Sequence, residues 1–338
     1  NMQPRDEQVP DDIADALTWI ESRSLALSSL DDPRLVRRAV DALSMNLDGS
    51  PSARSTTARK RATFNNALEY GVELGKFESN PMRKVRWSRR QFLEPVDKRV
   101  VANPAQARGL LAAAWDAAPA LAGFFALMYF AGLRPAEARG LGEKDCTLPP
   151  TGWGELTLSG SHQTAGGAWT DSGASGEDRC LKHRANDHVR VVPAHPELVG
   201  ILHRHLETFE TGVQGRLFVA RTGRAGVPLP APFANPVSMS TVYRAWADAR
   251  RAALTADQFA SPLARRPYDL RHACLSTWLN AGVPPAQVAE WAGHSVAVLL
   301  QVYSNCVDGE GETARRRIES ALDSSGGETS ARIPRGQP

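Results

Sequence analysis

The chain has 338 residues, 42% of them hydrophobic, and a formal net charge of +3. This length and apolar content favour two domains with packed cores. No apolar run approaches the ~18 residues of a membrane span, no signal-peptide core is seen, and the four cysteines have no regular spacing. These patterns argue against a membrane protein, a disulfide framework or a zinc site, and we expect a soluble protein of the reducing cytosol.

The first part of the chain is predicted to be helical. Its apolar periodicity predicts helices at residues 11–27, 32–47 and 52–75. The third follows Pro51 and places Phe64, Leu68 and Val72 on one face. We expect residues 1–80 to form one helical domain.

Charge is distributed unevenly over these helices. Between Asp6 and Asp48 there are ten acids and four bases, whereas between Arg54 and Arg90 there are ten Lys or Arg and three glutamates. A one-sided basic stretch is typical of a footprint for a polyanion, although a single charge run is more often a solvated helix face. The candidate residues for contact with a polyanion, which would be DNA if the resemblance described below holds, are Arg54, Arg59, Lys60, Arg61, Arg86, Arg89 and Arg90.

A basic interdomain linker is predicted over residues 81–103, because prolines flank a stretch rich in Lys and Arg. The second domain is expected at 104–323, and the polar tail at 324–338 is expected to be disordered. Helices are predicted at 104–118, 119–133, 135–145, 197–209, 240–254, 269–282, 284–293 and 295–304, and strands at 154–160, 188–195 and 216–220. The expected fold class is mainly α with a small antiparallel β-sheet, an α+β arrangement.

Two arginines stand at predicted helix entrances. Pro135 suits the first helical position, so Arg134 lies beside N–H groups that favour an anion, and its planar fork can hold two phosphate oxygens. A salt bridge to Glu137 is the simpler alternative for Arg134. Arg271 lies in the first turn of a helix that Asp269 is expected to cap, and pairing with Asp269 is its structural alternative.

Other side chains could complete a phosphate site. His294 follows Gly293, which is predicted to be left-handed and to hold the histidine on a rigid turn. Tyr303 is a core aromatic by periodicity and becomes a nucleophile only if its proton is removed in line with a phosphorus. Lys182 precedes a strand and could protonate a leaving alkoxide. His272 is interpreted as a packing or capping residue.

The set resembles the tyrosine recombinase, or phage integrase, family in order and spacing. AGLRPAE resembles the first arginine box of the family, and VRVVP resembles the end of its lysine hairpin. LRH followed by GHS, with nine residues from His294 to Tyr303, resembles its C-terminal box. The motifs span residues 127–305. Where the family has a histidine three residues before the second arginine, this chain has Tyr268, to which we assign a supporting role; the general base stays open.

The resemblance implies a reaction that needs neither cofactor nor metal. Tyr303 would attack the scissile phosphorus, form a 3′-phosphotyrosyl link and release a 5′-hydroxyl. Arg134 and Arg271 would neutralise the non-bridging oxygens, and His294 would hydrogen-bond the phosphate. Lys182 would protonate the leaving oxygen.

The resemblance also implies an assembly on double-stranded DNA. A helical core-binding domain and a mixed α/β catalytic domain would clamp a specific site, and a homotetramer would pass through a Holliday junction. The reaction would integrate or excise a mobile element in the cytoplasm, at the nucleoid, with accessory directionality or DNA-bending factors as compatible partners. Residues 313–322 are predicted to form an amphipathic helix that docks on a neighbouring protomer, or alternatively on its own domain.

Two other functions stay open from the sequence. One is a type IB topoisomerase-like enzyme, which nicks and reseals DNA by the same chemistry without paired sites. The other is a non-catalytic DNA-binding regulator with a decayed integrase domain, for which Tyr268 gives some room. The DNA target cannot be read from the sequence, because base readout depends on a few side chains in the grooves.

Overall fold

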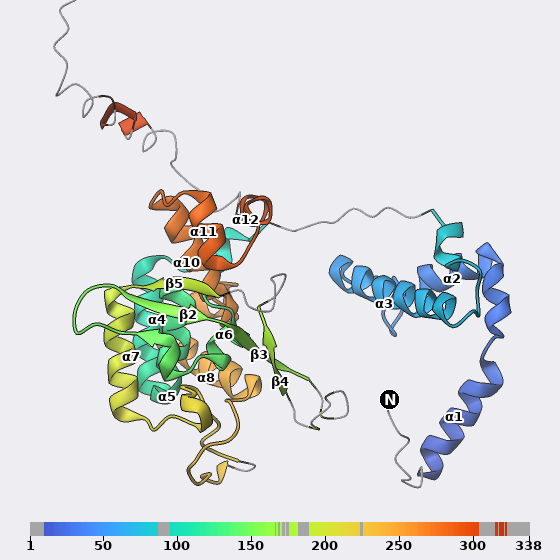
Figure 1. Cartoon of the computed structure of the whole chain (residues 1–338), viewed down its shortest axis with the longest axis horizontal. Coiled ribbons are helices and arrows are strands. Elements are labelled where there is room, and N and C mark those ends of the chain that lie inside the picture. Colours follow the sequence, from blue (N-terminus) through green and yellow to red (C-terminus); the bar gives the residue numbers. More distant parts are fainter. Residues whose placement is uncertain are drawn as a thin grey trace, which may run out of the picture. The chain divides into compact units, whose positions relative to one another are not determined.

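The computed structural model describes residues 10–86, 95–165, 167, 170, 173, 176–181, 189–223, 226–303, 315–316, 318–320 and 322. The chain divides into two compact units, Asn1–Phe92 and Leu93–Pro338 (Figure 1). Among the described residues, no helix is both long and apolar enough to cross a membrane.

The first unit is helical, with three helices in the predicted order. Its elements are α1 (Asp11–Arg23), the 3-10 helix η1 (Leu27–Asp31), α2 (Pro33–Ala42), α3 (Arg54–Glu73) and the 3-10 helix η2 (Pro81–Lys84). Asp32 caps α2 by accepting a hydrogen bond from the backbone N–H of Arg34 at 2.8 Å, and Pro33 occupies the first helical position. A small core forms between α2, α3 and η2, from Val36, Val40, Leu68, Met82 and Val85.

The second unit is mainly helical. Its α-helices are α4 (Pro104–Ala117), α5 (Pro119–Phe130), α6 (Pro135–Gly140), α7 (Pro196–Thr208), α8 (Met239–Ala253), α9 (Ala256–Ala260), α10 (Tyr268–Asn280), α11 (Pro285–Ala292) and α12 (Val296–Tyr303). Short 3-10 helices are η3 (Lys98–Val100), η4 (Glu143–Asp145) and η6 (Val213–Gly215). Helix α5 is buried from Leu121 to Phe130 and packs against α4, α6, α7 and α10. It is the centre of the main core, and the loop that follows it carries Arg134.

Two small antiparallel sheets accompany these helices. The first has the order β1 (Cys146–Thr147), β2 (Gly154–Leu158), β5 (Arg190–Ala194), and the second pairs β3 (Gly160–Thr164) with β4 (Gly176–Cys180). In the register of β2 and β5, Leu156 lies opposite Val192, and both are buried. The predicted fold class, mainly α with small antiparallel β-structure, is confirmed.

One strand prediction was wrong, and one pair of strands was not predicted. Residues 216–220 form isolated bridges instead of a strand, with Arg216 opposite Gly142 and Val219 opposite Pro236. The β3–β4 hairpin was missed, because its segments GSHQT and GEDRC show no apolar alternation. Most of the hairpin's residues are exposed or only half-buried, so no core-facing pattern marks them in the sequence.

A second core cluster joins α10, α11 and α12, which are labelled together in Figure 1. Leu275, Leu279, Val288, Leu299 and Tyr303 are buried there. The segment at 95–101 belongs to this unit, because Val96 is buried in the same cluster and its N–H bonds the carbonyl of Val302 at 2.7 Å.

The C-terminal part is only partly described. Within the helix predicted at 313–322, the described residues 315–316, 318–320 and 322 are helical, and the tail predicted at 324–338 lies outside the described residues.

Candidate active site

Five of the six residues predicted to carry chemistry lie in the described part of the second unit. Arg134 precedes α6, Tyr268 and Arg271 lie in the first turn of α10, His294 follows α11, and Tyr303 ends α12. The sixth, Lys182, lies outside the described residues. The loop before α6, the start of α10 and the α11–α12 turn are therefore the parts that position the candidate site.

Arg134 joins two of these parts. One guanidinium nitrogen, Nη1, bonds Glu137 Oε1 at 2.7 Å, and Nη2 donates to the carbonyl of Gly293 at 2.8 Å. The salt bridge considered as the simpler alternative is therefore present, and it holds the arginine against the α11–α12 turn. The backbone N–H of Arg134 also donates to Glu137 Oε2 at 2.8 Å, so the carboxylate, and not an open anion site, occupies this N–H of the helix entrance.

Glu137 organises a buried charge cluster that the sequence did not reveal. Its Oε2 forms an ion pair with Nη2 of Arg190 at 2.8 Å, and both side chains are almost fully buried. Burial acts to raise the pKa of Glu137, but the positive charges of Arg190, Arg271 and Arg134 lower it to about 2. The carboxylate is therefore ionised and fixes the orientation of two guanidinium groups.

Arg271 is the most deeply buried arginine of the cluster, with 0% of its surface exposed. Its guanidinium group donates to two backbone carbonyls, that of Gly132, in the loop that carries Arg134, and that of Ala292. The distance to the Ala292 oxygen is 2.6 Å. Its Nη2 also lies 3.1 Å from Nε2 of His294. The pairing with Asp269 that we considered is wrong, because the Asp269 carboxylate bonds the side chain of Arg266 at 3.0 Å.

The N-cap predicted at Asp269 was also wrong. Helix α10 begins one residue earlier, at Tyr268, and Asp269 lies inside its first turn. There it accepts a hydrogen bond from the backbone N–H of Arg266 at 2.8 Å, so it stabilises the helix entrance from within. Arg271 nevertheless stays in the first turn, as expected.

The turn between α11 and α12 has the predicted conformation. Gly293 is left-handed, with φ +63°, and Ser295 caps α12 through the N–H of Val298 at 3.2 Å. A Cβ at Gly293 would overlap the guanidinium of Arg190 and lie 3.1 Å from Nη1 of Arg134. Glycine is required here both for its backbone angle and because the two arginines pack against it.

His294 is held as a neutral ring among these cations. Burial lowers its pKa, and Arg271 and Arg134 lower it further, to about 3. Among the described residues, its buried Nδ1 has no hydrogen-bond partner, and the same is true of the buried Nε of Arg271. An imidazole N–H and a guanidinium N–H are both donors from which a phosphate oxygen can accept a hydrogen bond.

Tyr303 is buried, with 1% of its surface exposed, in the cluster that joins α10, α11 and α12. The packing role considered for it is therefore real. Its hydroxyl lies 3.0 Å from Nδ1 of His272, the residue next to Arg271 on α10. Burial lowers the pKa of His272, and Arg266 and Arg271 lower it further, to about 4.

Sequence reasoning missed His272 as part of the site. The available signal was its spacing, since a residue four positions after Tyr268 lies on the same helix face. In the structure the rings of Tyr268 and His272 meet edge to face at 5.1 Å, and those of His272 and Tyr303 lie 5.7 Å apart. The three rings form a row from α10 to α12.

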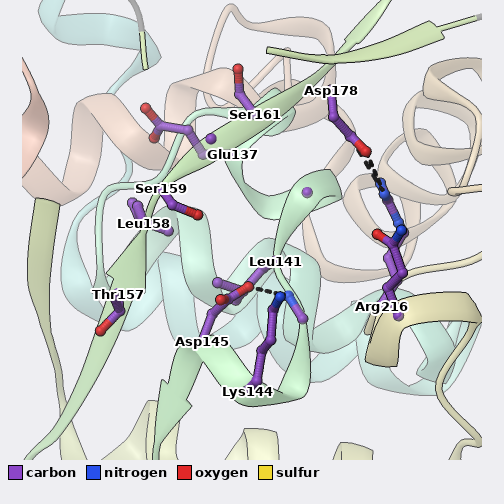
Figure 2. Close-up of a pocket in the computed structure, with 14 residues that line it drawn as sticks. Glu137, Leu141, Lys144, Asp145, Thr157, Leu158, Ser159, Ser161, Asp178 and Arg216 are labelled. Carbon is purple, nitrogen blue, oxygen red and sulfur yellow. Dashed lines mark hydrogen bonds and ion pairs between the residues drawn. The ribbon is translucent and has the colours of Figure 1, made fainter. Parts of the chain in front are cut away.

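A separate polar cavity of about 180 Å³ lies beside Glu137, between α6, η4 and the strands β2 and β3 (Figure 2). Figure 2 shows Lys144 and Asp145 on one wall and the ion pair of Arg216 with Asp178, 3.1 Å long, on another.

The described part of the chain contains no group of three or more His, Cys, Asp or Glu residues that could hold a metal ion.

The basic residues predicted to contact DNA fall into two kinds. Arg54 and Arg59 on α3 and Arg86 are exposed, whereas Lys60 and Arg61 are half-buried. The ammonium group of Lys60 bonds the carbonyl of Met45 at 2.9 Å and Ser52 Oγ at 3.0 Å, and Arg61 bonds Ser44 Oγ at 2.9 Å. Arg89 and Arg90 lie outside the described residues.

Neither the family models nor the curated protein sequences compared with this chain match it. Several solved structures are similar to this chain. The integrase of transposon Tn1549 in complex with circular intermediate DNA is 18% identical, with a TM-score of 0.55 over 88% of this chain and 87% of that one. The same integrase in complex with transposon right end DNA is 17% identical, with a TM-score of 0.53 over 90% and 98%. The XerH site-specific recombinase bound to its difH substrate is 13% identical, with a TM-score of 0.51 over 86% and 70%.

These likenesses extend over both units and over most of the chain. They agree with the resemblance that the arginine boxes and the GHS motif carry in the sequence. The chain thus has the integrase-type fold of the tyrosine recombinases.

Proposed function

We propose that this protein is a site-specific DNA recombinase that cuts and rejoins DNA through a 3′-phosphotyrosyl intermediate, for integration or excision of a mobile element. The observation that carries the proposal is the convergence of Arg134, Arg271 and His294 at the α11–α12 turn. Three segments that are far apart in the sequence supply these residues. A rigid set of cationic and neutral donors is what a phosphate diester requires in its transition state.

The proposed chemistry assigns a role to each residue. Tyr303 attacks the scissile phosphorus, its O–H bond breaks, and the bond from phosphorus to the 5′ oxygen breaks as the phosphotyrosyl bond forms. Arg134 and Arg271 stabilise the charge on the non-bridging oxygens, and His294 hydrogen-bonds the phosphate. Lys182 protonates the departing 5′ oxygen, and a 5′-hydroxyl of the partner strand reverses the step to rejoin the DNA.

The proposed substrate is double-stranded DNA with specific sites. The three structural neighbours described above were solved with DNA, as integrase and recombinase complexes. In this chain the exposed Arg54 and Arg59 on α3 are the first residues we assign to backbone contacts, since phosphate contacts set the register of a protein on DNA. Both units would contact the duplex, the first as the core-binding domain and the second as the catalytic domain.

Assembly is part of the same proposal. Four copies would bring two sites together and pass through a Holliday junction, with residues 313–322 docking on a neighbouring protomer. Ile318 of that segment is 59% exposed, so an apolar side chain there is accessible to a neighbouring protomer.

The test is covalent trapping on DNA. A pool of nicked duplexes with randomised sequence is incubated with the full chain, and adducts that survive denaturation are recovered and sequenced to define the site. We expect the wild type to form an adduct on the selected duplex. Tyr303→Phe should form none while binding the same duplex, because only the nucleophilic oxygen is removed.

The other outcomes discriminate the alternatives. An adduct that persists in Tyr303→Phe would overturn the nucleophile assignment. Relaxation of supercoiled DNA without paired sites, and without recombinant product, would favour the topoisomerase-like activity. Specific DNA binding without any wild-type adduct would favour a non-catalytic regulator.

A further inference from the structure

The row of rings from Tyr268 through His272 to Tyr303 addresses the question that the sequence left open, which group takes the proton of the nucleophile. The expected position is occupied by Tyr268, and a neutral phenol is a poor base near neutral pH. One helical turn further along α10, His272 places Nδ1 3.0 Å from the Tyr303 hydroxyl oxygen. This distance is within the range required of a general base.

Burial favours a protein group over bulk water as the acceptor of the Tyr303 proton. Tyr303 is 1% exposed, so bulk water has little access to its hydroxyl. The hydroxyl meets the half-buried ring of His272, which is held on one side by edge-to-face contact with Tyr268 at 5.1 Å. The base and the nucleophile are therefore aligned by packing before any substrate arrives.

The charges around His272 favour its neutral form. Burial is the first cause of its lowered pKa, of about 4, and the nearby Arg266 and Arg271 add to it. The remaining titratable groups that contact the ring among the described residues are Tyr268 and Tyr303. At neutral pH, Nδ1 can therefore accept a proton in the tautomer that carries its own proton on Nε2.

We propose that His272 is the general base that accepts the Tyr303 proton during strand cleavage, a role that rests on the proposed recombinase function. As the tyrosine oxygen bonds to phosphorus, its O–H bond breaks and an Nδ1–H bond forms on His272. The leaving 5′ oxygen takes a separate proton from Lys182. In the rejoining step His272 returns its proton to the tyrosine oxygen, so the cycle is balanced and consumes no further reagent.

The experiment measures adduct formation on the selected nicked duplex at pH 6 to 10. His272→Asn keeps a polar group of similar reach but cannot act as a base. We expect cleavage to slow by about 10²–10⁴-fold near neutral pH. The rate should then rise with pH as the tyrosine ionises, whereas the wild-type rate should be nearly flat from pH 6 to 9. DNA binding and far-UV circular dichroism confirm that the variant is folded.

Two chemical controls separate the base from the acid. Incorporating 3-fluorotyrosine at position 303 lowers the hydroxyl pKa, and it should restore much of the rate lost in His272→Asn. A 5′-bridging phosphorothiolate, whose sulfur leaves without a proton, should rescue Lys182→Ala but not His272→Asn. If His272→Asn fails to fold, fluorotyrosine in the otherwise wild-type chain still tests the role, because a working base makes the rate only weakly dependent on tyrosine acidity.

Each contrary result has a distinct meaning. A wild-type rate with a flat pH profile in His272→Asn would refute the base assignment and leave the recombinase function standing. Faster cleavage by this variant would also refute it, and would show that the histidine restrains the tyrosine. The absence of any adduct from the wild type would overturn the recombinase function and, with it, the role of His272.

Discussion

Positive charge is used in two different ways in the two units. On α3 of the first unit, Arg54 and Arg59 are exposed, as expected of a footprint that attracts a polyanion through solvent. In the second unit Arg271 is fully buried, and Arg190 nearly so, with guanidinium groups fixed by a carboxylate and by backbone carbonyls. Exposed charges attract a polyanion in a salt-dependent way, and substituting one of them has little effect on stability. Buried charges are held in a fixed geometry, and substituting one of them leaves its partner unpaired.

The largest loss of stability is expected from Glu137→Gln in the buried cluster. The change leaves Arg134 and Arg190 without their anionic partner in a site with little water. We expect a loss of about 3–5 kcal/mol in the free energy of unfolding, measured by urea denaturation. Glu155→Gln is the matched control, because Glu155 is exposed on β2 and its loss should change stability by no more than ~0.5 kcal/mol. Equal effects of the two changes would contradict the organising role of Glu137.

The dependence of stability on pH tests the same cluster, because acid protonates its neutral histidines. Burial and nearby arginines hold the pKa of His272 at about 4 and that of His294 at about 3 in the folded chain, against 6.5 for an unperturbed histidine. Below pH 6.5 the unfolded chain therefore binds more protons than the folded chain, so stability falls as pH decreases towards 4. We expect the thermal midpoint to be constant from pH 8 to 7 and to fall between about pH 6.5 and 5.

The control for this pH effect is a double variant, His272→Asn with His294→Asn. Asparagine does not titrate, so the decrease between pH 6.5 and 5 should shrink to the part that His162 and His205 contribute, because burial lowers the pKa of these two histidines as well. An unchanged decrease in the double variant would assign the acid sensitivity to other groups.

The smallest effect is expected on the surface of the first unit. Arg54→Ser combined with Arg59→Ser should weaken DNA binding and reduce the slope of log affinity against log salt by ~0.9 for each phosphate that the protein no longer neutralises. Stability should change by no more than ~0.5 kcal/mol, because both residues are exposed. Binding is measured by fluorescence anisotropy over a range of salt.

The matched change in the same helix is Lys60→Met, which removes the hydrogen bonds to Met45 and Ser52. It should lower stability more than the serine pair does. A salt slope that is unaffected by the serine pair would show that α3 does not face the DNA backbone.

Local patterns carried most of what the sequence could predict. Pro135, the left-handed Gly293 and the Ser295 cap each depend on neighbouring residues, and all three have the expected conformations. The helices follow from apolar periodicity and from prolines at their first positions. These signals come from residues close together in the sequence, so they predict local structure without knowledge of the tertiary fold.

The parts that were missed depend on contacts between distant segments. Arg190 interrupts the apolar alternation of its strand. Its ion pair with Glu137 joins two distant segments, so the sequence does not reveal it. His272 meets the Tyr303 hydroxyl only once α12 is folded against α10, because Tyr303 is 31 residues away. Position 271 was identified by its motif, but its bonds to Gly132 and Ala292 could be found only in the structure.

Three guanidinium groups share one carboxylate in the buried cluster, which leaves two positive charges in excess. Such an excess is costly where water is scarce, and a bound phosphate relieves it. Under the proposed function, the DNA strand therefore completes the charge balance of its own enzyme. Release of the DNA would then be the uphill step, so the same charge excess that the phosphate relieves would also slow the dissociation of a cut strand before it is rejoined.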